Sequence, residues 1–310
     1  MSRIVQYSRY GGPEVLEIVG VDEPHAGPGE VRVSVRAAGL NPFDSKVRQS
    51  PAMLPNRVLP SGQGAEFAGV IDEVGAGTAT STAPAPVAVG DEVLGWCNSS
   101  AQADFVIVPA DQVTVKPSTL SWAAAGGLGL VGNTAERSTR AVALTPGETV
   151  LVSAAAGGVG LFAAQLALAD GAIVIGTASE ANHDYLRGLG VIPVAYGPGL
   201  IDRLRTAAPN GIDAVIDNAG QETVEIAIEL GVDPKRINSI VYFDGVAKYG
   251  ISTIGGGGKK SEDLARLARL VADGSVALPI AGTYPLAEVR AAYQQLDSRH
   301  FLGKIVLTLP

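Results

Sequence analysis

The amino-acid sequence predicts an α/β fold in which a doubly wound parallel sheet is inserted into a β-rich domain. Residues 1–121 contain short alternating runs separated by Pro and Gly turns, residues 122–273 alternate between strand and helix patterns, and residues 274–310 return to mixed structure. A chain of 310 residues has room for two domains with separate cores. We therefore expect a β-rich domain from 1–121 with 274–310, and an α/β domain from 122–273.

The β-rich domain is expected from strand-like runs such as residues 30–36 and 66–74. Residues 77–86 are rich in Ala, Thr, Ser and Pro. They predict a solvated loop within the domain, because strand-like sequence resumes at Val87. A last strand is predicted over residues 304–308.

The α/β domain is expected from apolar strands that alternate with helical patterns. Residues 261–272 predict a helix with Leu264 and Leu267 on one face and Ser261 as a suitable N-cap. A further helix is predicted over residues 285–296, in the tail that belongs to the β-rich domain. The predicted strands are 149–152, 172–177, 192–195, 213–217 and 237–242.

A glycine-rich turn, Gly157 to Gly160, connects the first two of these strands. It follows an apolar strand and precedes a helical pattern, so its backbone N–H groups are expected at a helix N-terminus, where a pyrophosphate can bind. Ala155 stands where the usual motif has its first glycine, which leaves a tight turn without a ligand as the alternative. A membrane span over 151–169 is disfavoured by the central glycines and by Gln165.

Composition narrows the possible partners. A net charge of -8 gives no electrostatic reason to expect nucleic acid or an anionic membrane as a partner. The single cysteine, Cys97, cannot form an internal disulfide, which suits a reducing compartment. The first residues show no apolar signal segment. We expect a cytoplasmic protein.

The order of several short motifs resembles the medium-chain dehydrogenase/reductase superfamily, in its zinc-free quinone oxidoreductase branch. The resemblance covers essentially the whole chain and implies a Rossmann sheet within a GroES-like domain. It is carried by residues 10–16, 28–31, 37–44, 64–70, 89–93, 146–152 and 303–307.

The resemblance implies that no metal is bound. Zinc-bearing members have a cysteine at the position of Asn41 and a histidine at the position of Ala65, and their structural zinc needs four cysteines. The three histidines are scattered without ligand spacing. Cys97 is expected to be a packing residue, because no base is paired with it.

The resemblance also implies the cofactor site. Asn41 is expected near the nicotinamide or the substrate, in a positioning role, and Thr134 at the nicotinamide end. Asn41 before Pro42, and Asn218, could equally be turn residues. The remaining residues expected to bind the cofactor are Ala156, Gly157, Gly158 and Val159 at the pyrophosphate, with Asn218, Ser179 and Tyr196 lining the groove.

The expected cofactor is NADPH rather than NADH. Ala178 stands where NAD enzymes place an acid, and the small Ser179 after it leaves room for a 2′-phosphate. The resemblance places Tyr196 beside the adenosine phosphate. Against this, Glu180 is close by, and residues 179–183 contain no Lys or Arg to pair with a phosphate.

The function expected without a metal is NADPH-dependent transfer of a hydride to a quinone or to an activated C=C bond (an enone), acceptors that are already electrophilic. An enoyl-thioester reductase of a biosynthetic pathway and a non-catalytic NADPH-binding structural or regulatory protein remain as alternatives. A homodimer through an exposed edge strand at 248–254 is expected by resemblance. Residues 255–258 are expected to be a connector rather than a second phosphate loop.

Overall fold

The computed structural model describes residues 1–77 and 87–310. The chain forms two compact units, each with a hydrophobic cluster of its own. Unit 1 comprises Met1–Leu130, Lys260–Ser275 and Pro279–Pro310, and unit 2 comprises Val131–Lys259 and Val276–Leu278. Except for Gly77, the predicted loop 77–86 lies outside the described residues.

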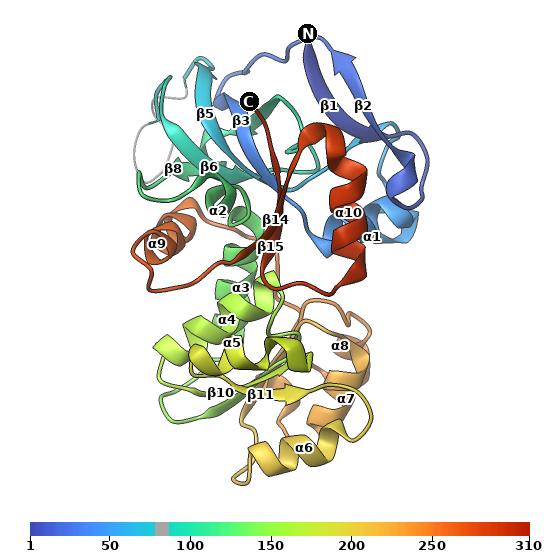
Figure 1. Cartoon of the computed structure of the whole chain (residues 1–310), viewed down its shortest axis with the longest axis vertical. Coiled ribbons are helices and arrows are strands. Elements are labelled where there is room, and N and C mark those ends of the chain that lie inside the picture. Colours follow the sequence, from blue (N-terminus) through green and yellow to red (C-terminus); the bar gives the residue numbers. More distant parts are fainter. Residues whose placement is uncertain (78–86) are drawn as a thin grey trace. The chain divides into compact units, whose positions relative to one another are not determined.

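Unit 1 is built on two sheets (Figure 1). One sheet has the order β2-β1-β4; the other has the order β14-β15-β3-β5-β6-β8, and β7 also pairs with β3. All of these pairs are antiparallel except β14 with β15. The strands are β1 (Ser2–Tyr7), β2 (Leu16–Val21), β3 (Glu30–Gly39), β4 (Ser61–Gly62), β5 (Glu66–Val74), β6 (Glu92–Trp96), β7 (Phe105–Pro109), β8 (Val113–Val115), β14 (Ile280–Pro285) and β15 (Lys304–Thr308).

Helices cover parts of these sheets. Helix α10 packs on β14 and β15 and against α1, and α2 packs on β3 and β5. The helices are α1 (Pro42–Gln49), α2 (Trp122–Gly126), α9 (Ser261–Ala272) and α10 (Val289–Ser298), with 3₁₀ turns η1 (Pro13–Val15), η2 (Pro51–Met53), η4 (Ala110–Gln112) and η7 (Leu286–Glu288). Helix α3 (Gly129–Ala141) begins in unit 1 and continues in unit 2.

The alternation predicted for residues 30–36 is confirmed in β3. Val31, Val33 and Val35 are at most 1% exposed, whereas the polar residues between them are half-buried. Successive side chains of a strand point to opposite faces, so the valines enter the core of unit 1.

Helix α1 was not predicted among the strand-like runs of residues 1–121. Pro42 begins the helix, where its missing N–H has no helical partner to lose. The backbone N–H of Asn41 donates to Asp44 Oδ2 at 2.9 Å, and the N–H of Asp44 donates to the carbonyl of Asn41. A helix of eight residues is too short for its apolar period to stand out in the sequence.

Unit 2 contains a five-stranded parallel sheet of order β11-β10-β9-β12-β13, which confirms the predicted fold class. Figure 1 shows α4 and α5 on one side of β10 and β11, with α6 and α7 on the other. The strands are β9 (Thr149–Val152), β10 (Ile173–Ala178), β11 (Ile192–Ala195), β12 (Ala214–Asp217) and β13 (Ile237–Ser239); the helices are α4 (Gly158–Ala169), α5 (His183–Gly188), α6 (Leu200–Ala207), α7 (Gln221–Glu229) and α8 (Gly245–Tyr249), with η5 (Glu180–Asn182) and η6 (Pro234–Arg236).

Every residue of β9 and β12 is buried, as expected for central strands of a parallel sheet. The chain turns between β9 and α4, and α4 has 12 residues. No helix in the described part of the chain is both long and apolar enough to cross a membrane.

Three elements begin or end at residues other than those predicted. Strand β13 stops at Ser239, because the Ser239 hydroxyl accepts the N–H groups of Val241 and Tyr242 and turns the chain. Ser261 is the first residue of α9 rather than its cap, which is Lys260. The tail helix begins as η7 and continues as α10.

The expected edge strand at 248–254 is wrong in its first part. Lys248 and Tyr249 belong to α8, which ends at Gly250 in a left-handed conformation. Only Ser252 pairs with the sheet, through a single parallel bridge to Asn238. The expected homodimer stays a prediction.

The limits of the compact units differ from the predicted domain limits. Helix α2 lies in unit 1, because it packs on β3 and β5. Helix α9 also lies in unit 1, because it packs on β8. Both had been expected in the α/β domain, since a helical pattern does not reveal which sheet a helix will cover.

The turn between β9 and α4 brings two backbone segments into close contact. Ala154 has a φ of +48°, and a Cβ atom at Gly160 would collide with the carbonyl oxygen of Ala154. Ala155, which replaces the first glycine of the usual motif, is fully buried, and a Cβ atom at Gly176 would lie 2.7 Å from its side chain. Glycines at 160 and 176 therefore make room for this turn.

We predict that Gly160→Ala lowers the free energy of unfolding by about 1–3 kcal/mol, because the backbone contact leaves no room for a methyl group. The matched control is Gly188→Ala in α5, where no atom lies within 4 Å of the added Cβ. That change should raise the free energy of unfolding by about 0.4–1 kcal/mol. Urea unfolding measures both, and equal effects of the two variants would contradict the prediction.

Candidate active site

The carboxyl ends of β9 and β12 are joined by a buried carboxylate, Asp217. Its Oδ1 accepts from the hydroxyl of Ser153 at 2.7 Å, and its Oδ2 accepts from the hydroxyl of Ser239 at 2.6 Å. The backbone N–H groups of Ala219 and Gly220 also donate to it. Asp217 is 0% exposed, so this network holds the strand ends in fixed positions.

Asn218 follows this carboxylate and is half-buried. Its backbone N–H donates to the hydroxyl of Ser153 at 2.7 Å, and its Nδ2 donates to the Ser153 carbonyl at 2.9 Å. Its Oδ1 is buried without a hydrogen-bond partner. A buried acceptor without a donor is costly, so a ligand with an N–H or O–H group fits this place.

The predicted pyrophosphate turn lies at the N-terminus of α4. Gly157 is the N-cap, and the N–H groups of Gly158 and Val159 begin the helix, where they have no acceptor within it. The N–H of Gly157 donates to the carbonyl of Ala154, so Gly157 offers no donor to a phosphate. Ala156 is 7% exposed. The dipole of a 12-residue helix favours an anion at this end.

The expected adenosine end lies at the ends of β10 and β11. Ala178 and Ala195 are paired in register, so Ser179 and Tyr196 leave the sheet side by side. Tyr196 is 60% exposed. The Ser179 hydroxyl accepts from Asn182 at 3.2 Å.

The sequence reading missed a cation at this edge, Arg203 in α6. Its guanidinium donates to the carbonyls of Ala195 at 2.9 Å and Pro198 at 2.8 Å, and also to those of Tyr196 and Gly197. Residues 179–183 contain no Lys or Arg, and Arg203 lies further along the chain, in α6. A cation one turn into the helix that follows β11 was the signal that could have found it.

Thr134 lies in the buried part of α3 and is 5% exposed. It belongs to unit 2 with the glycine turn and Asn218, whereas Asn41 belongs to unit 1. The expected contacts of Thr134 and Asn41 with the nicotinamide or the substrate stay predictions.

Unit 1 contains a buried charged cluster around Asn41. The ammonium of Lys304 donates to Asn41 Oδ1 at 2.7 Å, to Glu66 Oε1 at 2.6 Å and to the carbonyl of Leu40 at 2.7 Å. Asn41 Nδ2 donates to Glu66 Oε1 at 2.8 Å, and the N–H of Leu130 donates to Glu66 Oε2 at 2.7 Å. Asn41, Glu66 and Lys304 are all less than 5% exposed.

Sequence reasoning missed Glu66 and Lys304 as site residues. Each opens a strand whose next residues are buried and apolar, and charged residues are rarely buried unless they are paired. Two opposite charges, each at the start of an apolar strand, were the available signal. Their pairing across 238 positions could come only from the fold.

This cluster does not fit a zinc ion. At the two positions where zinc-bearing relatives are expected to carry ligands, the chain has the Asn41 amide and the methyl group of Ala65. The positive charge beside Asn41 is the ammonium of Lys304. Among residues 1–77 and 87–310, no three His, Cys, Asp or Glu side chains gather to hold a metal. Zinc independence stays a prediction based on this donor set.

Asp44 is buried next to this cluster, where its Oδ2 accepts the backbone N–H of Asn41. Burial raises the pKa of Asp44 to about 7, although the N–H of Asn41 opposes that shift. Arg48, which is 0% exposed, stacks over the ring of Tyr293 at 4.5 Å. Burial also raises the pKa of the Tyr293 hydroxyl well above its usual value. The hydrogen bond that Asp44 accepts from the N–H of Asn41 gives this carboxyl a structural role at the start of α1.

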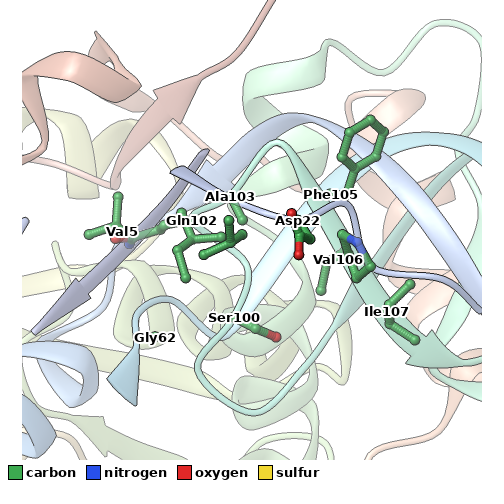
Figure 2. A pocket seen from close by; sticks show the side chains of 12 residues that line it. Val5, Asp22, Gly62, Ser100, Gln102, Ala103, Phe105, Val106 and Ile107 are labelled. Atoms are coloured by element: carbon green, nitrogen blue, oxygen red, sulfur yellow. The ribbon is translucent and has the colours of Figure 1, made fainter. Parts of the chain in front are cut away.

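Unit 1 also contains a pocket with a volume of about 270 Å³ (Figure 2). None of the predicted site residues lines it. Its lining is mainly apolar, with Asp22, Ser100 and Gln102 as polar members.

Cys97 is buried as expected, with its Sγ 3.6 Å from the carbonyl of Gly64.

Comparison with known proteins identifies the family. Residues 27–128 match the family model of the alcohol dehydrogenase GroES-like domain, and residues 194–307 match that of the zinc-binding dehydrogenase. A quinone oxidoreductase of Pseudomonas aeruginosa is 31% identical over 99% of each chain. The chain belongs to the quinone oxidoreductase branch of the medium-chain dehydrogenase/reductase superfamily. Members of this superfamily are oxidoreductases, and the predicted resemblance is confirmed.

Solved structures agree with this medium-chain dehydrogenase/reductase assignment. The quinone oxidoreductase of Coxiella burnetii has a TM-score of 0.87 at 30% identity, covering 100% of this chain and 99% of that one. The quinone oxidoreductase of Escherichia coli complexed with NADPH has a TM-score of 0.86 at 26% identity and covers 100% of both chains. The NADPH bound in the Escherichia coli structure supports a nicotinamide cofactor.

Other relatives differ in length and name. An NADPH-dependent alkenal/one oxidoreductase of Arabidopsis thaliana is 28% identical over 97% of this chain and 78% of its own. A mycocerosic acid synthase-like polyketide synthase of Mycolicibacterium smegmatis is 30% identical over 97% of this chain. This chain spans only 15% of that synthase, and 8% of a pikromycin polyketide synthase component of Streptomyces venezuelae.

We predict that the raised pKa of Asp44 makes stability depend on pH. The folded chain holds this proton up to about pH 7, whereas the unfolded chain releases it near its usual value of 3.8. The free energy of unfolding should therefore fall as the pH rises between these values, by up to about 1.4 kcal/mol per pH unit, and level off above pH 7.

Asp44→Asn is the control, because it retains a side-chain acceptor for the N–H of Asn41 without the titration. Denaturant unfolding of both proteins across this pH range measures the difference. A difference between the two that does not change with pH would contradict the prediction.

Proposed function

We propose that the protein is an NADPH-dependent oxidoreductase that transfers a hydride to a quinone or to an activated C=C bond without a metal. The observation that carries the proposal is the edge of the sheet in unit 2. There the N–H groups of Gly158 and Val159 begin α4, and the buried Oδ1 of Asn218 lacks a donor. One end of this edge fits an anionic pyrophosphate and the other fits a polar group with N–H or O–H donors.

In this proposal the chain binds and orients the reactants. Gly158 and Val159 hold the pyrophosphate, Ser179 and Tyr196 line the adenosine end, and Thr134 and Asn218 hold the nicotinamide end. When bound, reduced nicotinamide supplies a hydride. The Ser153–Asp217–Ser239 network keeps Asn218 fixed, so little ordering is left to the moment of binding.

The acceptor side is proposed to involve Asn41. The hydride and its electron pair go to the acceptor, negative charge develops on its carbonyl oxygen, and water later supplies the proton. A hydrogen-bond donor at that oxygen lowers the barrier. A quinone or enone is electrophilic enough to react with one hydrogen-bond donor at its oxygen and no metal. This suits the cluster around Asn41, which has an amide at the position where a metal site would need a ligand.

An enoyl-thioester reductase is the second candidate, favoured by the polyketide synthase relatives. An enoyl thioester is an activated C=C bond as well, so the same site serves it. The net charge of -8 argues against a strongly basic docking patch for an acidic carrier. A protein that binds NADPH without turnover is a third outcome of the test below. We also propose a homodimer, as the resemblance implies, and a cytoplasmic location, which suits a chain whose single cysteine cannot form an internal disulfide.

The deciding experiment follows NADPH oxidation by the purified protein with a panel of quinones, enones and enoyl thioesters. We expect turnover with a quinone or enone, and no loss of activity after treatment with a chelator. Preference for thioesters would favour the second candidate. Tight NADPH binding without oxidation by any acceptor would favour a non-catalytic role, and failure to bind either coenzyme would refute the proposal.

We predict that Ser179→Asp disfavours NADPH. The Ala178 side chain is only 4% exposed, so the half-buried Ser179 is the better place for a test carboxylate. A carboxylate beside a 2′-phosphate should weaken NADPH binding about 100-fold, which corresponds to about 2.7 kcal/mol. Binding of NADH should change little. Calorimetry with both coenzymes measures the ratio, Ser179→Ala is the control, and an unchanged ratio would contradict the assignment.

A further inference from the structure

The cluster of Asn41, Glu66 and Lys304 has its hydrogen bonds almost fully committed. A lysine ammonium has three N–H donors, and Lys304 directs them to Leu40, Asn41 and Glu66. Lys304 is 3% exposed, so its ammonium is almost completely shielded from solvent. It therefore has no donor left for a substrate.

The same contacts fix the orientation of the Asn41 amide. An ammonium only donates, so the atom 2.7 Å from it must be the amide oxygen, and the other atom must be Nδ2. Nδ2 carries two hydrogens, and one of them is used by Glu66 at 2.8 Å. The backbone N–H of Asn41 is already used by Asp44. The second Nδ2–H is the donor of this asparagine that remains for a ligand.

We propose that Lys304 is a positioning residue that acts through Asn41: its ammonium fixes and polarises the Asn41 amide, whose second Nδ2–H donates to the carbonyl oxygen of the electron acceptor. This inference rests on the proposed function. It assigns the electrostatic role that a metal would have near an acceptor oxygen to a lysine that does not itself touch the acceptor.

The physical reason lies in the amide. A positive charge on the amide oxygen draws electron density from the nitrogen, which makes each N–H a stronger donor. In a buried site this effect is larger than in water, because the effective dielectric constant is lower. The donor gains most when the acceptor oxygen carries the most negative charge, which is in the transition state.

Glu66 makes the arrangement stable. Its carboxylate balances the buried ammonium, and its other oxygen accepts the N–H of Leu130 at 2.7 Å. Removing Lys304 alone would leave a buried carboxylate without its cation, which is strongly destabilising. The test therefore replaces both charges, since a neutral pair of similar volume is often tolerated.

The first test uses a double variant that carries both Lys304→Met and Glu66→Gln, and compares it with the wild type. The control combines Lys116→Met with Glu92→Gln, an ion pair in which the lysine is buried and the glutamate is exposed. Lys116 is 6% exposed and pairs with Glu92 at 2.9 Å in the same unit, without contacting Asn41. Steady-state kinetics with a quinone and an enone, thermal unfolding and calorimetry with NADPH are measured for all three proteins.

We expect kcat for the enone to fall about 10-fold, less than the 10²–10³ for loss of a whole oxyanion donor. The fall for the quinone should be smaller, because a stronger electron acceptor depends less on the hydrogen bond. KM and the affinity for NADPH should stay unchanged, and the control should match the wild type. Equal losses for both acceptors, or no loss, would overturn the proposal.

A second test adds a substitution at Asn41 itself and a readout on the free protein that does not depend on turnover. Asn41→Asp retains an oxygen for the Lys304 ammonium but has no N–H, so kcat for the enone should fall by at least as much as in the double variant. In the free protein, the side-chain N–H proton resonances of Asn41 should move to lower chemical shift when Lys304 and Glu66 are neutralised, and should not move in the control. An unmoved resonance overturns the inference. Absence of all turnover in the wild type, with the resonance moved, refutes the proposed function instead.

Discussion

The close approach of α4 to the turn after β9 is the constraint on which unit 2 depends. The carbonyl of Ala154 occupies the space that a side chain at Gly160 would need, and buried Ala155 occupies the space of a side chain at Gly176. This packing places the N-terminus of α4 at the carboxyl edge of the sheet, where the strand order changes direction between β9 and β12. An alanine at 155 is tolerated because β10 carries a glycine opposite it.

In unit 1 the corresponding constraint is electrostatic. Lys304 and Glu66 are buried together, and they connect the end of β3, the start of α1, β5 and the first turn of α3 through hydrogen bonds. A buried pair contributes little net stability, but it permits only one arrangement of its partners. That property explains why Asn41 has a fixed amide orientation, on which the proposed chemistry depends.

The two sites follow a common pattern, in which a buried charge holds an asparagine in place. Asp217 does so for Asn218 through Ser153, and Lys304 does so for Asn41 directly. Asn218 is held through Nδ2 and its Oδ1 is left over, whereas both amide atoms of Asn41 are engaged and one Nδ2 hydrogen is left over. Family membership establishes an oxidoreductase, and the acceptor is left to the panel of substrates.

The sequence by itself determined the fold class, the strands at 192–195 and 304–308 and the helix at 261–272. These depend on the local spacing of apolar residues and on the turn residues that bound each element. It also located the glycine turn. Only the tertiary structure decided that α9 packs with unit 1, that Arg203 reaches the end of β11, and that Lys304 meets Glu66. The physical reason is that burial, pairing and hydrogen bonding between distant residues arise from the packing of whole elements, and no local pattern encodes which partner each buried charge will meet.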